Sequence, residues 1–137
     1  MIIPRRILLL TILYMSILMF NLILTAEQYH YVEVEISSIV SNPSEWLDRR
    51  IRVEGVIEPV ITIPEVKPPF NYWLIDRDNR SLKIGVRWDG WILKFGVPVE
   101  VEGVLRVGYF KVLSPSGWKI GLKIYYVEVE NVRILEG

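Results

Sequence analysis

Two glutamates at matching places in the sequence are the first candidates for acid–base chemistry. Glu54 and Glu102 each lie in a Val-Glu-Gly-Val segment, at 53–56 and at 101–104. Two carboxylates held close together can act as general acid and general base. Glutamates on strands mostly face solvent, however, and take part in no reaction. We therefore expect no catalytic residue from this pair.

Three aspartates are the candidates for binding a hard cation. Asp76, Asp78 and Asp89 offer the oxygen ligands that Ca²⁺ and Mg²⁺ prefer. Arg77 and Arg80 stand beside the first two aspartates. An arginine next to a carboxylate favours a surface ion pair over a cation site. We expect no metal here.

Histidine and cysteine chemistry is largely excluded by composition. His30 is the single histidine, and the sequence has no cysteine. One imidazole makes no metal site, and without thiolates there is no zinc ribbon, iron–sulfur centre, disulfide or cysteine nucleophile. The sequence therefore predicts a binding or structural module rather than an enzyme, with no cofactor of its own.

Net charge argues against a dedicated nucleic-acid binder. The chain has 16 Lys and Arg against 16 Asp and Glu; without Arg5 and Arg6, 14 basic residues (16 − 2) face 16 acidic ones, a net charge of −2. Nucleic-acid binders usually carry a basic excess. Abundant Ile, Val, Glu and Arg with a single Gln are also typical of thermophile proteins.

An uncharged apolar run at residues 7–26 predicts a transmembrane helix. A helix of this length spans ~30 Å, one hydrocarbon core. Arg5 and Arg6 precede the run and Glu27 follows it, so the positive-inside rule places residues 1–6 in the cytoplasm and the rest outside. A cleaved signal peptide is the alternative, although its apolar region is usually only ~7–15 residues long. We expect an uncleaved single-pass anchor in the cell membrane.

Strands dominate the rest of the chain. Residues 27–35 alternate apolar and charged side chains and predict a short strand or linker. Residues 36–137 form the predicted domain, which begins with a short helix at 36–47. Five strands follow, predicted at 49–57, 70–77, 80–88, 97–107 and 118–135. A short segment separates the third strand from the fourth, and a loop is predicted at 108–117. The last strand is expected to bend at Asn131.

Glycine stands in the middle of two predicted strands, in the segments 53–56 and 101–104. A glycine midway along a strand costs stability and marks a bulge or a sharp bend. Two strands that bend in this way predict a sheet rolled into a small closed barrel. Two unrelated strands of an open sheet are the alternative.

The segment 39–56 carries a short helix and then basic–apolar alternation that ends at glycine. This segment, and five strands with an insertion after the third, resemble an OB-fold, an all-β five-stranded Greek-key barrel. The resemblance covers residues 36–135. It implies a binding surface on the second and third strands, flanked by the loops after strands one and four, and it implies no single activity.

The layout is also similar to that of the periplasmic haem chaperone of cytochrome c maturation, an anchored OB barrel. The similarity is carried by 86–90, Gly96 and 99–105. That family attaches haem through a histidine or a cysteine after the barrel, and this chain has neither residue after His30. The resemblance therefore implies no covalent haem carriage.

The turn between the second and third strands sets the binding surface. With Asp78 and Asn79 as a two-residue turn, Trp73 and Ile75 would face the interior and Gly85 would leave room over Tyr72 on the outer face. The flanking loops add further cations and aromatic rings. The predicted ligand-binding residues are Phe70, Tyr72, Leu74, Lys83 and Arg87 on the face, and Lys67, Tyr109 and Lys111 on the loops.

Aromatic rings between cations suit several ligands. They suit stacked bases, sugars, peptides and hydrophobic partners. The proline-rich loop could instead cover the rings and leave no ligand site. We expect a non-catalytic extracytoplasmic binding or assembly module with a protein or peptide partner. The alternatives are an accessory factor of cytochrome or respiratory-complex maturation that handles a cofactor non-covalently, and a single-stranded nucleic-acid-binding domain.

Overall fold

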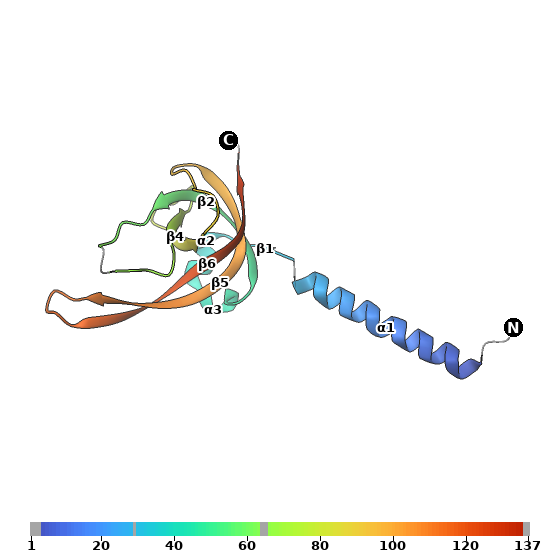
Figure 1. The fold of residues 1–137 in the computed structure, drawn as a ribbon. Coiled ribbons are helices and arrows are strands. Elements are labelled where there is room, and N and C mark those ends of the chain that lie inside the picture. The colour runs from blue at the N-terminus through green and yellow to red at the C-terminus, as the bar shows by residue number, and fades with distance from the viewer. Residues whose placement is uncertain (1–3, 29, 64–65, 136–137) are drawn as a thin grey trace. The chain divides into compact units, whose positions relative to one another are not determined.

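A computed structural model describes residues 4–28, 30–63 and 66–135 of the chain (Figure 1). The chain divides into two compact units, Met1–His30 and Tyr31–Gly137. The first unit consists of helix α1 (Arg5–Gln28). The second holds every strand and two short helices.

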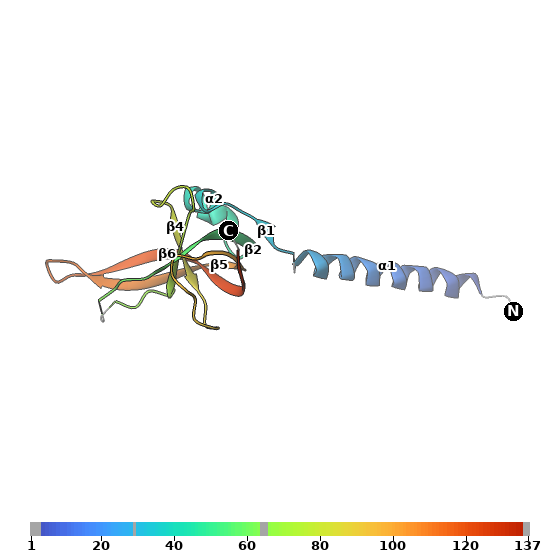
Figure 2. The same ribbon diagram turned by 90° about the horizontal axis from the view of Figure 1, so that it is seen from above.

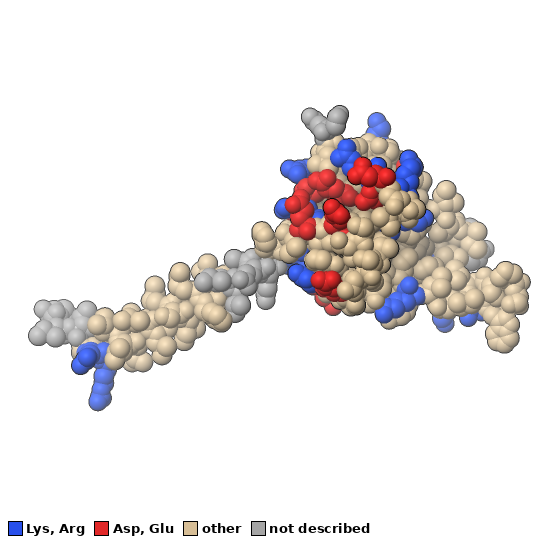
Figure 3. All heavy atoms as spheres, turned by 180° about the vertical axis from the view of Figure 1, so that it is seen from behind, with Lys and Arg blue, Asp and Glu red and all other residues tan. Residues whose placement is uncertain are grey.

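Helix α1 is long and apolar enough to cross a membrane. No residue of its span Arg5–Leu22 is buried. In Figure 3, the coloured part of α1 shows charge only at Arg5 and Arg6, the two arginines of its first turn. The hydroxyls of Thr11 and Ser16 donate to the carbonyls of Ile7 and Ile12. The polar groups of both side chains are therefore satisfied within the helix, as an apolar environment requires.

The second unit is built mainly from strands. Its elements are β1 (Val32–Glu33), α2 (Ile36–Ser41), α3 (Pro43–Trp46), β2 (Arg50–Pro59), β3 (Tyr72–Ile75), β4 (Lys83–Arg87), β5 (Pro98–Leu113) and β6 (Lys119–Ile134). The helical segment predicted at 36–47 is therefore two short helices, and Pro43 opens the second, where its missing N–H costs nothing. A β-rich domain after an apolar helix is confirmed.

The strands form one ring-like sheet (Figures 1 and 2). Their order is β1-β2-β3-β4-β6-β5, and a further pairing of β2 with β5 closes the ring. The β4–β6 and β1–β2 pairs are parallel, and the others are antiparallel. Alternate side chains of β2 and β5 point inward, where Ile51, Val53, Val101 and Leu105 are fully buried. From α2, Ile36 and Ile39 join this core.

The two Val-Glu-Gly-Val segments pair with each other, with Val53 opposite Val101. At Gly103 the register of β5 against β6 shifts, which confirms the bulge predicted from this glycine. A Cβ at Gly103 would lie 2.2 Å from the carbonyl oxygen of Glu128. Gly55 has no such shift; a Cβ there would lie 2.7 Å from both the Ile75 carbonyl oxygen and Cγ of Leu74.

The predicted register of the β3–β4 hairpin is wrong by one residue. Tyr72 pairs with Val86 and Leu74 with Ile84, rather than with Gly85 and Lys83. A two-residue turn needs positive φ, and among the described residues Asp48 is the only non-glycine residue that has it.

A longer, side-chain-supported loop replaces the predicted two-residue turn. One carboxylate oxygen of Asp76 accepts hydrogen bonds from the backbone N–H groups of Asp78 at 2.9 Å and Asn79 at 3.0 Å. The backbone N–H of Asp76 also donates to the carbonyl of Leu82 at 2.9 Å. Because side chains alternate along a strand, the one-residue shift exchanges the inward and outward faces of β3. β4 keeps its predicted faces, with Ile84 and Val86 buried and Lys83 and Arg87 exposed.

The predicted loop at 108–117 is also mostly strand. β5 continues to Leu113, and a short turn closed by a 2.8 Å hydrogen bond from Ser114 N–H to the Trp118 carbonyl leads into β6. In the ring, β4 pairs with β6 only at 126–128 and β2 with β5 only at 98–104. Residues 108–124 therefore form a two-stranded extension, here called the arm, which projects from the ring in Figures 1 and 2.

Candidate functional site

The register shift moves the three predicted aromatic and aliphatic face residues off the exposed surface. Leu74 is 0% exposed and Phe70 is 5% exposed. Tyr72 is half-buried, and its hydroxyl accepts a hydrogen bond from the Leu93 N–H at 3.4 Å. These side chains build the ring rather than a ligand surface, so the predicted face needs correction.

Phe70 fills the space that Gly85 leaves. A Cβ on Gly85 would lie 2.5 Å from Cγ of Phe70. The Phe70 ring also packs against Trp73, with centroids 4.6 Å apart. The predicted gap over Tyr72 is therefore closed by Phe70, which comes from the end of the proline-rich loop.

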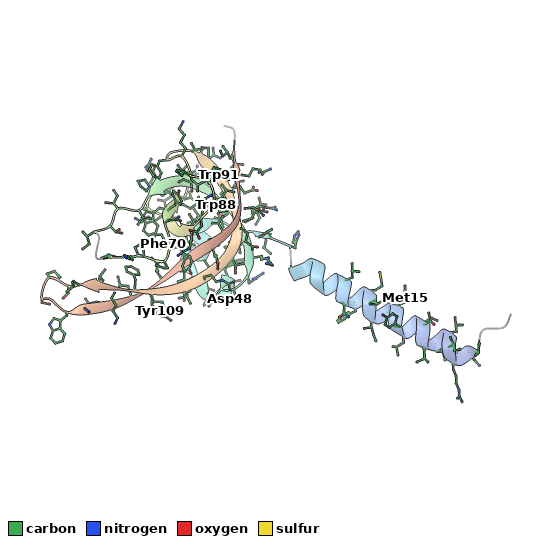
Figure 4. The ribbon with its side chains drawn as sticks, in the orientation of Figure 1. Met15, Asp48, Phe70, Trp88, Trp91 and Tyr109 are labelled. Carbon is green, nitrogen blue, oxygen red and sulfur yellow. The ribbon has the colours of Figure 1, made fainter. Side chains whose placement is uncertain are left out.

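The other predicted residues remain exposed but do not form one cluster. Lys67 lies on the loop before β3, and Tyr109 and Lys111 lie on the arm. Arg87 is held by Asp89 in an ion pair of 3.3 Å. Figure 4 shows Phe70 and Tyr109 on opposite sides of the base of the arm. Of the predicted face, Lys83 alone enters the groove described next.

Trp73 lies on the outward face of β3, where the sequence predicts Tyr72 and Leu74 instead. It is half-buried, and the Lys83 ammonium lies 4.4 Å from the centroid of its indole ring. Such a cation–π contact contributes ~0.5–1 kcal/mol at exposed sites. The sequence predicts Trp73 in the interior because the two-residue turn that it predicts is too short.

A second lysine–aromatic pair lies on β6. The Lys123 ammonium is 5.3 Å from the ring centroid of Tyr125. A hydrogen bond to the Tyr125 side chain raises the pKa of Lys123 above its ordinary value. The ammonium is therefore fully charged at neutral pH. The alternation of side chains along the last strand does not indicate that Lys123 and Tyr125 lie near Lys83.

Both lysine–aromatic pairs line one groove, which lies between the short helices α2 and α3 and the paired strands β4 and β6. The groove has a volume of about 300 Å³. Its apolar walls come from Ile39, Val40, Pro43, Ile84 and Ile124. In the described part of the chain, neither Lys83 nor Lys123 forms an ion pair. The groove thus combines apolar walls with two ammonium groups that have no carboxylate partner, which suits a ligand with an apolar body and anionic groups.

The acidic side chains gather elsewhere, around Arg52 on β2. Carboxylate oxygens of Glu33, Glu54 and Glu100 lie within 4.8 Å of one another. Glu100 is largely buried, but Arg52 at 3.5 Å and Arg133 at 3.0 Å neutralise it. Acidic and basic side chains are interspersed over the ring in Figure 3. Glu100 is therefore a partner in an ion-pair network rather than a free carboxylate.

The glutamates predicted as a pair are not opposite each other. Glu54 pairs across the strands with Glu100, whereas Glu102 pairs with Arg52. Arg52 donates to a carboxylate oxygen of Glu102 at 2.7 Å, and this bond raises the pKa of the guanidinium. Glu102 is therefore occupied by an arginine rather than free for proton transfer.

No protein-family model matches the sequence, and no curated protein matches it.

Proposed function

We propose that this chain is a membrane-tethered, non-catalytic binding module that holds an acidic, apolar peptide segment of a protein partner in the groove. The groove carries the proposal: Lys83 and Lys123 rest on Trp73 and Tyr125 beside apolar walls. A peptide with leucine or phenylalanine next to aspartate or glutamate would bury its apolar side chains and pair its carboxylates with the two ammonium groups.

An OB-type barrel is the architecture that we propose for the second unit. The closed order β2-β3-β4-β6-β5 and the parallel β4–β6 pair support it, because a five-stranded Greek-key barrel has these connections. In such barrels ligands bind over the second and third strands, here β3 and β4. The groove includes Trp73 from β3 and Lys83 from β4, which agrees with that location.

We propose that α1 anchors the chain in the cell membrane and that the second unit lies outside the cytoplasm. The length and apolar surface of α1 support the anchor. Arg5 and Arg6 at its start support a cytoplasmic N-terminus. A tethered module of this kind would present the groove to partners beyond the bilayer.

Peptide binding to the full chain in nanodiscs tests the proposed ligand. The probe is a labelled peptide with alternating Leu and Glu, compared with the same peptide carrying Gln for Glu. We expect binding of the Glu peptide to be at least tenfold tighter, and the double variant Lys83→Met/Lys123→Met to abolish this preference. Lys94→Met is the matched control, because Lys94 is exposed and does not line the groove.

Three outcomes would contradict the proposal. Equal binding of both peptides would show that the carboxylates are not recognised. An unchanged preference in the double lysine variant would place recognition outside the groove. Tighter binding of an oligothymidylate, with a steep loss of affinity as salt rises, would indicate a nucleic-acid site instead.

A further inference from the structure

The edge of β6 that faces away from β5 is unpaired over residues 119–125. β4 pairs with β6 only from Tyr126 onward, where Gly85 stands opposite it. Among the described residues, no other strand pairs with β6 before that point, and no backbone hydrogen bond outside its pairing with β5 reaches this stretch. An unpaired strand edge offers a row of N–H and C=O groups to a further strand.

The turn of the arm shows which backbone groups face this edge. The Ser114 N–H donates to the Trp118 carbonyl at 2.8 Å, in the same register as the residue pairs that follow along the arm. Hydrogen-bonded and non-hydrogen-bonded pairs alternate between antiparallel strands. Lys119, Gly121 and Lys123 therefore direct their N–H and C=O groups away from β5, toward the unpaired edge.

The side chains of this stretch alternate between a basic and an apolar face. Lys119 and Lys123 flank Gly121 on one side, here called the lysine face, and Ile120 and Leu122 lie on the other. All five residues are exposed, and a Cβ on Gly121 would meet no described atom within 4 Å. A strand of alternating acidic and apolar residues matches this edge on both faces, because neighbouring strands place opposite residues on the same face.

The unpaired edge leads into the groove. The groove lies where β4 and β6 separate, with Lys83 and Ile84 from β4 on one wall and residues 123–125 of β6 on another. Residues 123–125 thus belong both to the edge and to the groove. A segment extended along 119–125 spans ~20 Å and runs from the arm into the groove.

Charge favours an acidic segment of a partner over a second copy of this edge. No acidic residue occurs within 108–124. An antiparallel pairing of the edge with itself, centred on Gly121, would set Lys119 of one copy opposite Lys123 of the other. Like charges directly opposite each other destabilise paired strands, whereas opposite charges stabilise them.

We propose that the partner's acidic segment binds as an added β-strand along residues 119–125, with its carboxylates on the lysine face and its apolar side chains on the other. The inference rests on the proposed peptide-binding function and extends its site from the groove to the arm. Backbone hydrogen bonds supply affinity in this mode, and the alternation of side chains supplies specificity. A third strand also stabilises the arm, because a lone two-stranded hairpin is marginally stable in water.

Amide hydrogen exchange, followed by NMR on the full chain in nanodiscs, tests the added strand. The probe is the peptide with alternating Leu and Glu. We expect saturating peptide to slow the exchange of the Gly121 and Lys123 N–H groups at least tenfold, because both gain an acceptor. The Leu113 N–H faces the opposite edge of the arm and should change less than twofold. Unchanged exchange at Gly121 and Lys123 while the peptide is bound would overturn the proposal.

Proline substitutions test the same edge by affinity. Gly121→Pro removes one N–H from the unpaired edge and none that bonds to β5, so the Glu peptide should bind at least tenfold more weakly. Leu113→Pro removes an N–H from the opposite edge of the arm and should weaken binding less than twofold. The exchange measurement uses the unsubstituted chain, so it decides the question even where a proline distorts the arm.

The outcomes separate this proposal from the proposed function. Equal binding of the Glu peptide by Gly121→Pro and the parent chain would exclude the added strand and leave the groove as the site. Failure of the parent chain to bind the Glu peptide would overturn both proposals. Equal weakening by Gly121→Pro and Leu113→Pro, without slowed exchange at Gly121, would also exclude the added strand.

Discussion

Gly103 determines at the residue scale how closely β5 and β6 approach. Its backbone lies against Glu128, where the register of the two strands shifts around Glu130. Any side chain here would meet backbone atoms, which cannot rotate away. In the same tetrapeptide at 53–56, the glycine makes room for the Ile75 carbonyl oxygen and for the buried Leu74 side chain, without a register shift. One sequence motif therefore serves two packing needs in one ring.

Gly103→Ala should destabilise the second unit markedly. The added methyl would lie 2.2 Å from the carbonyl oxygen of Glu128, so the bulge must open. We expect the free energy of unfolding to fall by about 1–3 kcal/mol, the usual cost of overpacking. Urea unfolding followed by circular dichroism measures this change.

Gly121→Ala on the arm is the matched control, because no atom lies within 4 Å of its added Cβ. This substitution should change the free energy of unfolding by less than ~0.5 kcal/mol. Equal effects of the two substitutions would refute this role for Gly103.

At the element scale, strand positions were predictable but the pairing of the hairpin was not. Alternation predicts β2, β5 and β6 well, and the bulge predicted from Gly103 lies opposite Glu130, next to the bend predicted at Asn131. The β3–β4 register depends on hydrogen bonds from Asp76 to two backbone N–H groups. An Asp-Asn pair is compatible both with a tight turn and with this wider loop, so local sequence does not distinguish the two.

This single shift explains most of the difference between the predicted and the observed site. It turned Leu74 inward and Trp73 outward, and so changed which aromatic ring meets Lys83. The groove also needs Lys123 and Tyr125, which are about 40 residues from Lys83 in the sequence but line the same wall. Only the parallel β4–β6 pairing brings these segments together, and sequence periodicity carries no information on it.

The arm should be dispensable for folding of the ring. Tyr109 and Lys123 lie directly opposite each other, so Asn-Gly in place of residues 110–122 would close the strands with a tight turn. Ring pairings and buried core residues lie outside the deleted segment. We expect a thermal midpoint within about 4 °C of that of the parent chain, measured in detergent. A chain that no longer melts cooperatively would show that the arm is needed to form the sheet.

At the scale of the whole molecule, the two units differ in what stabilises them. α1 has an apolar surface without a core of its own, whereas the second unit buries 16 of its described hydrophobic residues and closes its own sheet. The groove and the arm both belong to the second unit. Changes in α1 should therefore alter where the protein lies without altering how the ring folds.

Arg5 and Arg6 should determine which side of the membrane the second unit faces. Basic residues beside an apolar helix are retained in the cytoplasm, and α1 has no other charge in its span Arg5–Leu22. Lys94→Cys places a unique thiol at an exposed position of the second unit. We expect an impermeant maleimide to label this thiol in intact cells. The double change Arg5→Glu/Arg6→Glu should reduce the labelled fraction severalfold, whereas Arg5→Lys/Arg6→Lys should preserve it.

Labelling that appears only after lysis would place the groove in the cytoplasm and remove the extracytoplasmic partner. Full labelling of the glutamate variant would show that some other part of the chain sets the orientation.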